Sequence, residues 1–209
     1  MTESSRRIGI FGGTFDPVHL GHLILAEQGR EQGNLDEIWL IPAAQPPHKQ
    51  DSTLTRFDQR VEMLELAIAG NPTFKIETIE NERPDLSYTA DTLRELQARH
   101  PEADFHLLIG TDSLMDLPGW YQPHQVLHFA SLLVMHRAGY PKPSDEQIHQ
   151  HFQSLTKTVP LRMQWMEDPP LVDLASSNLR QRVKQGRSIR YVVPRAVEAY
   201  VKEKKLYLD

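Results

Sequence analysis

The stretch IGIFGGTFDPVHLGH, residues 8–22, decides the fold of this chain. Its first four residues form an apolar run typical of a strand buried on both faces, and Gly12-Gly13 then breaks that run. The next residues deliver His19 and His22 to the beginning of an expected helix. Glycine permits positive φ and close approach of the backbone, and a helix start offers unpaired N–H groups and the positive end of a dipole. This junction is therefore suited to bind phosphate, to which the two imidazoles also hydrogen-bond.

Apolar runs alternate with amphipathic segments along the whole chain. The expected strands are residues 7–11, 37–41, 74–79, 105–109, 132–136 and 161–165. The expected helices are residues 20–32, 56–69, 90–100, 178–185 and 194–204. This alternation predicts one α/β domain over residues 1–209, with a doubly wound, Rossmann-like, mostly parallel sheet and helices on both faces. Ligands are then expected outside the carboxyl ends of the strands.

Two local details can be checked against the structure. In the helix expected at residues 56–69, Thr55 and Asp58 have the spacing of a capping box, and Gly70 is expected to end the helix. Residues 138–160, which contain two prolines before the next apolar positions, break the alternation. We expect them to form a surface excursion with one short helix.

Composition and charge exclude several classes of protein. The chain has 23 Lys and Arg against 28 Asp and Glu, a formal charge of −5, so it lacks the positive field that drives binding to nucleic acid. It has no cysteine for a disulfide or a thiolate nucleophile, which suits a reducing cytoplasm. We expect no signal peptide before the first strand and no membrane segment, hence a cytoplasmic protein.

Three interpretations compete for His19 and His22: packing or helix capping, a zinc site, and a phosphate site. Zinc would need further ligands that the surrounding sequence does not offer, so we expect no protein metal site. Only the phosphate interpretation explains the glycines and the helix start together. The run resembles the HxGH nucleotidyltransferase superfamily, which moves a nucleotidyl group from a nucleoside triphosphate to a second substrate and releases pyrophosphate. The residues that fall on its pattern are Gly12, Gly13, Thr14, Phe15, Pro17, His19, Gly21 and His22.

A second motif, LASSNLR, occupies residues 174–180. Taken alone, its serines are expected to cap a helix, with Arg180 one turn further on as a surface charge. In the superfamily, a similar Ile-Ser-Ser-Thr-x-x-Arg motif binds the triphosphate from the side opposite the histidines. The resemblance therefore assigns Ser176, Ser177 and Arg180 to ATP, although Ala175 stands where the first serine is usual.

Three further motifs concern the second substrate: IPAAQPPHK at residues 41–49, SYTADT at residues 87–92, and Gly110-Thr111-Asp112 followed by Trp120. Individually they are compatible with a stiff proline loop, a helix cap formed by Ser87 or Thr89, and a core tryptophan. Together they are similar to the bacterial nicotinate mononucleotide adenylyltransferases. This similarity extends from residue 8 to residue 207, apart from residues 138–160.

That resemblance implies a role for each motif residue. Nicotinate is expected to stack on Trp120, with its carboxylate bonded near Thr89. Asp112 is expected to bind ribose hydroxyls, while His48 and Lys49 approach phosphates. Because N–H and O–H donors around Thr89 and Trp120 suit a carboxylate, and no acidic residue is evident to accept from a carboxamide, we expect the acid to be preferred over the amide.

The implied reaction joins nicotinate mononucleotide to the AMP portion of ATP, giving deamido-NAD and pyrophosphate in NAD biosynthesis. His19, His22, Lys49 and Arg180 are the expected catalytic residues around the triphosphate, and Mg²⁺ arrives on the ATP phosphates. Arg137 matches a basic segment near the nucleotide, but with Ala138 in place of the family's proline.

Other functions remain open from the sequence. The same chemistry could act on nicotinamide mononucleotide or phosphopantetheine, and a noncatalytic nucleotide sensor could keep the fold. A dinucleotide-binding oxidoreductase also begins with a strand and glycines, but Gly9, Gly12 and Gly13 do not have the G-x-G-x-x-G spacing. The expected partners are ATP and the mononucleotide, without nucleic acid or membrane, and a homo-oligomer is compatible with the sequence.

Overall fold

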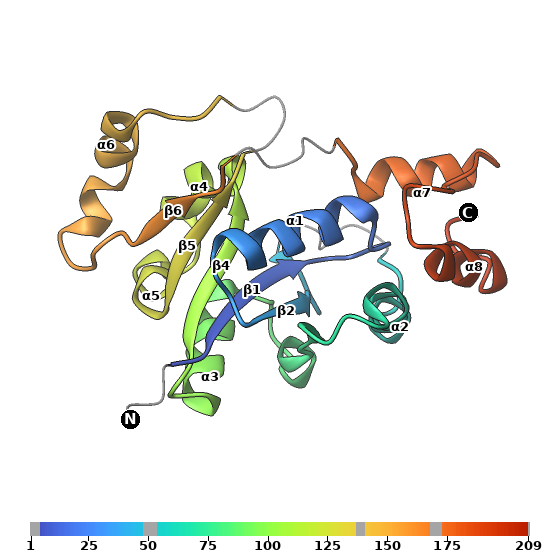
Figure 1. Ribbon diagram of the computed structural model, residues 1–209, viewed down its shortest axis with the longest axis horizontal. Helices are drawn as coiled ribbons and strands as arrows, with labels where there is room; N and C mark the ends of the chain where they lie inside the picture. The colour runs from blue at the N-terminus through green and yellow to red at the C-terminus, as the bar shows by residue number, and fades with distance from the viewer. Residues whose placement is uncertain (1–4, 48–53, 137–140, 168–172, 209) are drawn as a thin grey trace.

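A twisted sheet of six parallel strands forms the centre of the molecule (Figure 1). The computed structural model describes residues 5–47, 54–136, 141–167 and 173–208. The strands are β1 (Arg7–Gly13), β2 (Glu37–Pro42), β3 (Phe74–Ile76), β4 (Asp104–Gly110), β5 (Ala130–Met135) and β6 (Met163–Trp165). Their order is β3-β2-β1-β4-β5-β6, so the chain winds outward in both directions from the β1–β4 pair. Such a switch point opens a crevice at the carboxyl ends of β1 and β4.

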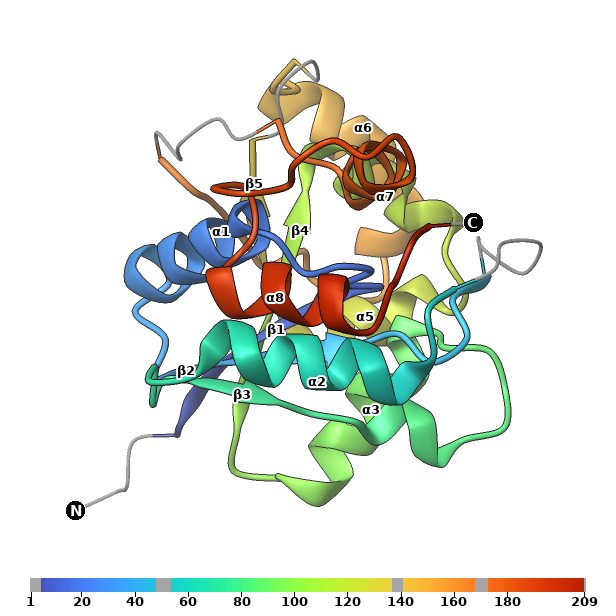
Figure 2. The ribbon, with the colours of Figure 1, turned by 90° about the vertical axis from the view of Figure 1, so that its right-hand side faces the viewer.

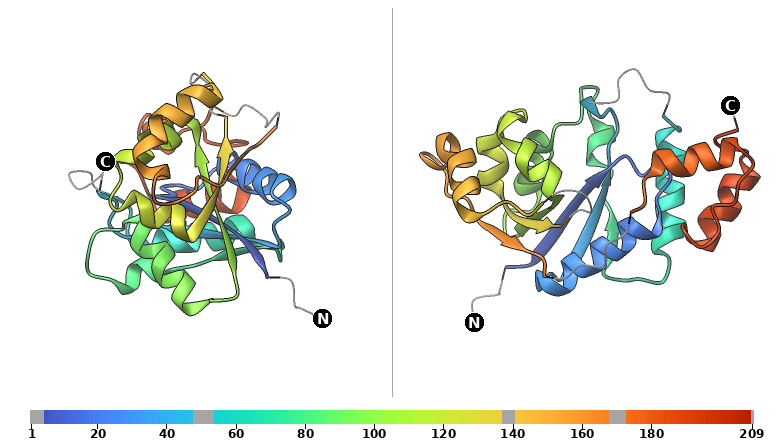
Figure 3. Two further views of the ribbon diagram at one scale, coloured as in Figure 1. Left: turned by 90° about the vertical axis from the view of Figure 1, so that its left-hand side faces the viewer. Right: turned by 90° about the horizontal axis from the view of Figure 1, so that it is seen from above.

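Helices cover both faces of this sheet (Figure 3). They are α1 (Leu20–Gln32), α2 (Phe57–Ile68), α3 (Thr89–Arg99), α4 (Thr111–Asp116), α5 (Pro123–Phe129), α6 (Asp145–Thr156), α7 (Ser176–Lys184) and α8 (Arg195–Glu203). Two short 3₁₀ segments, η2 (Ile79–Glu82) and η3 (Leu117–Gly119), follow β3 and α4. The doubly wound α/β fold expected from the sequence is confirmed.

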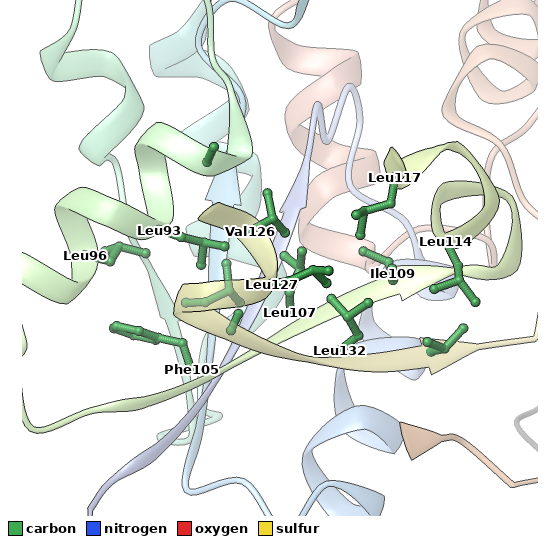
Figure 4. Packing of buried hydrophobic residues seen from close by; sticks show 14 of the residues in the cluster. Leu93, Leu96, Phe105, Leu107, Ile109, Leu114, Leu117, Val126, Leu127 and Leu132 are labelled. Atoms are coloured by element: carbon green, nitrogen blue, oxygen red, sulfur yellow. The ribbon is translucent and has the colours of Figure 1, made fainter. Parts of the chain in front are cut away.

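Alternate residues of the strands feed two hydrophobic clusters, one on each face. Leu107 and Ile109 of β4 pack with α3, α5 and α6, as the close view in Figure 4 shows for part of this cluster. Leu108 points to the opposite face, where it joins the side of the core that α1, α2, α7 and α8 cover. On that face α2 and α8 pack side by side (Figure 2). No helix within the described ranges has the length and apolar character needed to cross a bilayer.

Two local expectations near α2 and β3 are wrong. β3 ends at Ile76, and Ile79 instead begins η2. The Thr55–Asp58 capping box does not form, because the Thr55 N–H donates to the Asp16 carboxylate at 3.2 Å. Long-range contacts thus outweigh the local signals at both places, whereas Gly70 does follow α2 with a φ of +89°, as a helix stop requires.

Residues 141–160 contribute more to the core than a surface excursion would. They contain α6, which begins with a capping box between Ser144 and Gln147. Its apolar face buries Ile148, Phe152 and Leu155 against the cluster under α5. The capping-box residues and the helical spacing of the apolar residues are both present in the sequence, but the neighbouring prolines made a surface excursion the expected structure. Residues 138–140 lie outside the described residues.

Candidate active site

A pocket of about 540 Å³ lies at the carboxyl ends of the central strands. Most of the described site residues expected from the sequence line it: Gly12, Gly13, Thr14, Phe15, His19, His22, Thr89, Asp112, Trp120, Ser176 and Ser177. A second cavity of about 630 Å³ between α4 and α6 is lined by Thr111 of the third acceptor motif but by none of the residues expected to contact a substrate. We therefore take the first pocket as the candidate active site. His48, Lys49 and Arg137 lie outside the described residues.

The two histidines cap α1 through each other. The His22 N–H donates to His19 Nδ1 at 3.3 Å, and the His19 N–H donates to His22 Nδ1 at 3.2 Å. Their rings stack with centroids 3.6 Å apart, and the edge of Phe15 packs against His22. Because each Nδ1 accepts a hydrogen bond, each neutral ring carries its proton on Nε2. The capping and phosphate interpretations are thus compatible, since they use different ring nitrogens.

Burial sets the charge of the first imidazole. His19 is only 4% exposed, and this burial lowers the pKa of its ring to about 4, against the opposing effect of its backbone hydrogen bond. The ring is therefore neutral near pH 7 and acts as an N–H donor without charge.

The start of α1 offers fewer backbone donors than expected. The Leu20 N–H donates to the carbonyl of Val192, and the His22 N–H is taken by His19. The expectation that the first-turn N–H groups of α1 are unpaired is wrong for these two residues. The phosphate interpretation at this junction therefore rests on the imidazoles and the helix dipole rather than on these two N–H groups.

The glycine turn before the histidines does not use the conformational freedom expected of it. Neither Gly12 nor Gly13 has positive φ, and the left-handed residue is the buried Phe15, with a φ of +50°. A Cβ on Gly13 would lie 3.0–3.2 Å from the Phe15 ring, whereas a Cβ on Gly12 would enter open space. Gly13 therefore makes room for Phe15, while Gly12 keeps the wall of the pocket clear.

The serine motif contacts the histidine loop directly. Ser176 Oγ donates to the carbonyl of Pro17 at 2.9 Å across 159 residues of sequence, and Arg180 Nη1 donates to the carbonyl of Asp16 at 2.7 Å. The expected serine cap is wrong, because Ala175 occupies the N-cap position and no side chain caps α7. The first-turn N–H groups of α7 are therefore not taken by a cap, at a helix end that lines the pocket.

The acceptor motifs meet on the other side of the pocket. Thr89 is the first residue of α3, which also has no side-chain cap, so the expected cap from Ser87 or Thr89 is wrong. Ser87 Oγ instead accepts a hydrogen bond from the Gln45 N–H at 3.0 Å, which joins this motif to the loop after β2. The rings of Tyr88 and Tyr121 pack in a tilted arrangement with centroids 4.5 Å apart, which joins the start of α3 to the residue after Trp120.

One residue of this pocket was missed by the sequence reasoning. Glu80 of η2 lines it and is 7% exposed, which corrects the expectation that no acidic residue stands there. Its Oε1 accepts a hydrogen bond from the Thr92 hydroxyl at 2.8 Å, while its Oε2 is buried without a partner. Burial raises the pKa of Glu80, and the Thr92 hydrogen bond opposes this effect. Among the acidic residues of 77–82, no local signal distinguishes Glu80.

Asp16 was also missed, although it lies inside the first motif. It is 1% exposed, and its Oδ1 accepts a hydrogen bond from the Tyr207 hydroxyl at 2.7 Å. Burial raises the pKa of Tyr207, so the phenol stays protonated as a donor. The C-terminal segment thereby holds the histidine loop. Within the described ranges, no three His, Asp or Glu side chains come together as metal ligands.

Known proteins resemble this chain over nearly its full length. Residues 10–182 match the family model described as cytidylyltransferase-like. A probable nicotinate-nucleotide adenylyltransferase of Geobacillus thermodenitrificans is 41% identical over 96% of this chain and 86% of its own length. A probable nicotinate-nucleotide adenylyltransferase of a Synechococcus strain is 42% identical over 98% and 96%. The solved Plasmodium falciparum nicotinic acid mononucleotide adenylyltransferase complexed with NaAD shares the fold, with a TM-score of 0.78, 20% identity and 97% coverage of both chains.

Proposed function

The chain belongs to the cytidylyltransferase-like family and, at 41–42% identity to curated relatives, to its nicotinate-nucleotide adenylyltransferases, and we propose that it transfers the adenylyl group of ATP to nicotinate mononucleotide. The products are deamido-NAD and pyrophosphate. One observation carries the proposal: Ser176 and Arg180 bond to the loop that ends in His19, beside the pocket that also contains Thr89 and Trp120.

The triphosphate binds between α1 and α7. The Nε2–H groups of His19 and His22 donate to it from one side, and the first turn of α7 donates from the other. Arg180 supplies positive charge at the join between the two motifs, because its guanidinium keeps donors beyond the one that the Asp16 carbonyl accepts. These donors are preorganised, so they stabilise the charge that develops on the departing pyrophosphate.

The acceptor binds against Trp120 and the start of α3. The nicotinate ring stacks on the indole, and its carboxylate accepts hydrogen bonds from Thr89 and the uncapped first turn of α3. Asp112, in the first turn of α4, binds ribose hydroxyls. Among the described residues, the uncapped start of α3 makes this half of the pocket suitable for an anionic ring.

Transfer proceeds in line at the α-phosphorus of ATP. A phosphate oxygen of the mononucleotide forms the new P–O bond while the bond to the β-phosphate bridging oxygen breaks, and pyrophosphate leaves with that electron pair. The attacking phosphate is anionic near neutral pH, so the reaction needs no general base. Positioning and charge stabilisation then supply the catalysis.

The donor set fits Mg²⁺ that arrives bound to ATP. The described lining includes the imidazoles of His19 and His22 and the carboxylates of Glu80 and Asp112, and phosphates with water would supply most ligands of the ion, as Mg²⁺ prefers. When bound, the ion neutralises phosphate charge. Three expectations from the sequence stay predictions: the roles of His48, Lys49 and Arg137, the cytoplasmic location, and the oligomeric state.

Pyrophosphate release tests this function. The purified protein is supplied with ATP and Mg²⁺ and with either nicotinate mononucleotide or nicotinamide mononucleotide. We expect release with both, and a higher kcat/KM for the acid, because the Thr89 hydroxyl and the uncapped start of α3 favour a carboxylate over a carboxamide. No release with either acceptor would reject adenylyl transfer to pyridine nucleotides. Equal values, or a preference for the amide, would reject only the choice of acceptor.

A further inference from the structure

A buried arginine that no expected motif contains lies beneath the candidate active site. Arg60 belongs to α2 and is 1% exposed. Its Nη1 donates to the carbonyls of Thr14 at 2.9 Å and Ala43 at 2.8 Å, and its Nε donates to the carbonyl of Thr55 at 3.0 Å. These partners are backbone carbonyls rather than a carboxylate in an ion pair.

The three carbonyls come from three separate segments. Thr14 follows β1 in the glycine turn, Ala43 follows β2, and Thr55 precedes α2. Thr14 and Ala43 both line the pocket. A planar guanidinium donates in fixed directions, so the three segments cannot shift relative to one another without breaking a hydrogen bond.

The backbone of Thr55 also connects Arg60 to the histidine loop. Its carbonyl accepts from Arg60, while its N–H donates to the Asp16 carboxylate at 3.2 Å. The main chain of Asp16 is in turn held by Arg180. The turn between Thr14 and Asp16 is therefore held from α2 on one side and from α7 on the other.

Removing a guanidinium from water is unfavourable, and burial lowers the pKa of Arg60 while the charge of Asp16 opposes this effect. An apolar side chain in this place would avoid that cost if packing were the only requirement. The arrangement of its partners suggests a more specific role.

We propose that Arg60 is a positioning residue for adenylyl transfer, which sets the turn carrying Thr14 against the β2 exit at Ala43 and so places the histidines relative to the bound triphosphate. This inference rests on the proposed function in one respect, namely that the pocket binds ATP. Arg60 itself does not touch the reacting atoms.

Arg60→Lys is the main test. Lysine keeps the charge, but its ammonium is a single point that cannot reach three carbonyls in the directions of the guanidinium fork. We expect a folded protein whose kcat falls at least about tenfold, since small displacements of catalytic groups are costly. KM for the mononucleotide should change less than kcat, because Thr89, Asp112 and Trp120, which are proposed to bind the nicotinate ring and ribose, are not among the hydrogen-bond partners of Arg60.

Met63→Ala is the matched control. Met63 lies on the same helix, is fully buried in the hydrophobic core and has no N–H or O–H group to donate to the three carbonyls. We expect this variant to lose thermal stability but to keep kcat within about twofold when assayed well below its Tm. A kcat for folded Arg60→Lys that is also within twofold of wild type would overturn the proposal.

A second variant and a binding measurement complete the design. Arg60→Met fills the space without burying a charge and should show the same loss of kcat. Calorimetric titration with α,β-methylene ATP should show affinity at least about fivefold weaker in Arg60→Lys and unchanged in Met63→Ala. This readout needs no acceptor, so it separates the proposal from a failure of the proposed function. If neither Arg60 variant folds, Arg60 is a folding residue and the proposal is rejected.

Discussion

His19 and His22 accept each other's backbone N–H groups at α1, and their rings lie 3.6 Å apart in a stack. The spacing of three residues that aligns them in the motif is the spacing of a capping box. One geometry is thus compatible with two purposes, because the Nδ1 atoms hold the helix start while the proposed phosphate contact uses the Nε2 atoms. Changing either histidine should therefore affect both stability and turnover, in separable amounts.

His22→Ala should lower kcat by about a hundredfold through the loss of one preorganised donor. It should also lower the free energy of unfolding by about 1 kcal/mol, because the His19 N–H loses its acceptor. His22→Gln provides the control, since glutamine at this position completes a capping box. Its stability should recover while its turnover stays low, as measured by thermal unfolding and pyrophosphate release. Near-normal turnover of folded His22→Ala would contradict the assigned role.

Ser176 and Arg180 should differ in what they contribute. Ser176→Ala removes the hydrogen bond to Pro17 and should cost about 1 kcal/mol of stability with little change in kcat. Arg180→Ala removes the bond to Asp16 together with the positive charge beside the triphosphate, so kcat should fall about a hundredfold. Urea unfolding and steady-state kinetics on both variants check the contrast. Equal kinetic losses would show that both residues act only by holding the loop.

Acid should destabilise the protein through His19. Its pKa is about 4 in the folded state, below the ordinary value of 6.5, so the unfolded chain takes up the proton first. The contribution of this group is constant above about pH 6.5 and is lost as the pH falls toward 4, to a total of about 3 kcal/mol.

The matched variant for this pH dependence is His19→Asn, because asparagine caps helices well and does not titrate. The difference in the free energy of unfolding between wild type and variant, measured in urea at several values between pH 7.5 and 4, should change across this window. Other titratable groups, including His106, are present in both proteins, so their contributions cancel in this difference. A difference that stays constant with pH would show that the folded-state pKa of His19 is not lowered.

Gly12→Val and Gly13→Val should behave differently. A side chain at Gly12 enters open space in the pocket, so ATP binding should weaken at least tenfold with little change in Tm. A side chain at Gly13 meets the buried Phe15 ring, so that variant should lose stability, by about 1–3 kcal/mol for an overpacked site. Calorimetric titration with α,β-methylene ATP and thermal unfolding test the pair. Unchanged affinity in Gly12→Val would argue against phosphate contact at this turn.

The choice of acceptor should depend on Thr89 and Glu80. Thr89→Ala should reduce the preference for the acid, because it removes a hydroxyl donor to the carboxylate. Glu80→Gln should increase that preference, since it removes a like charge from the wall of the same pocket. Trp120→Ala serves as the comparison and should weaken both acceptors alike through lost stacking. The measurement is kcat/KM for both mononucleotides at fixed ATP. A smaller preference in Glu80→Gln would instead indicate that the Glu80 carboxyl is protonated and donates to the acid.

The sequence by itself determined the features that depend on neighbouring residues. The apolar runs predicted five of the six strands to within two residues at each end, and α1 falls at residues 20–32 as expected. Because helices alternate with those strands, the carboxyl ends of the sheet were the expected place for the motifs, and the pocket lies there. These predictions were correct for one physical reason: the spacing of apolar residues and the position of glycines determine the local structure within a few residues.

Only the tertiary structure decided how distant segments meet. The contact of Ser176 with Pro17, the three carbonyls around Arg60 and the position of Glu80 in the pocket wall all join parts of the chain that carry no local signal for one another. Another distant contact, between Thr55 and Asp16, overturned the Thr55–Asp58 capping box, because an N–H that donates to a distant carboxylate is lost to its neighbours. Hydrogen bonds between remote segments depend on where the packed core places each backbone, and that is a property of the whole fold.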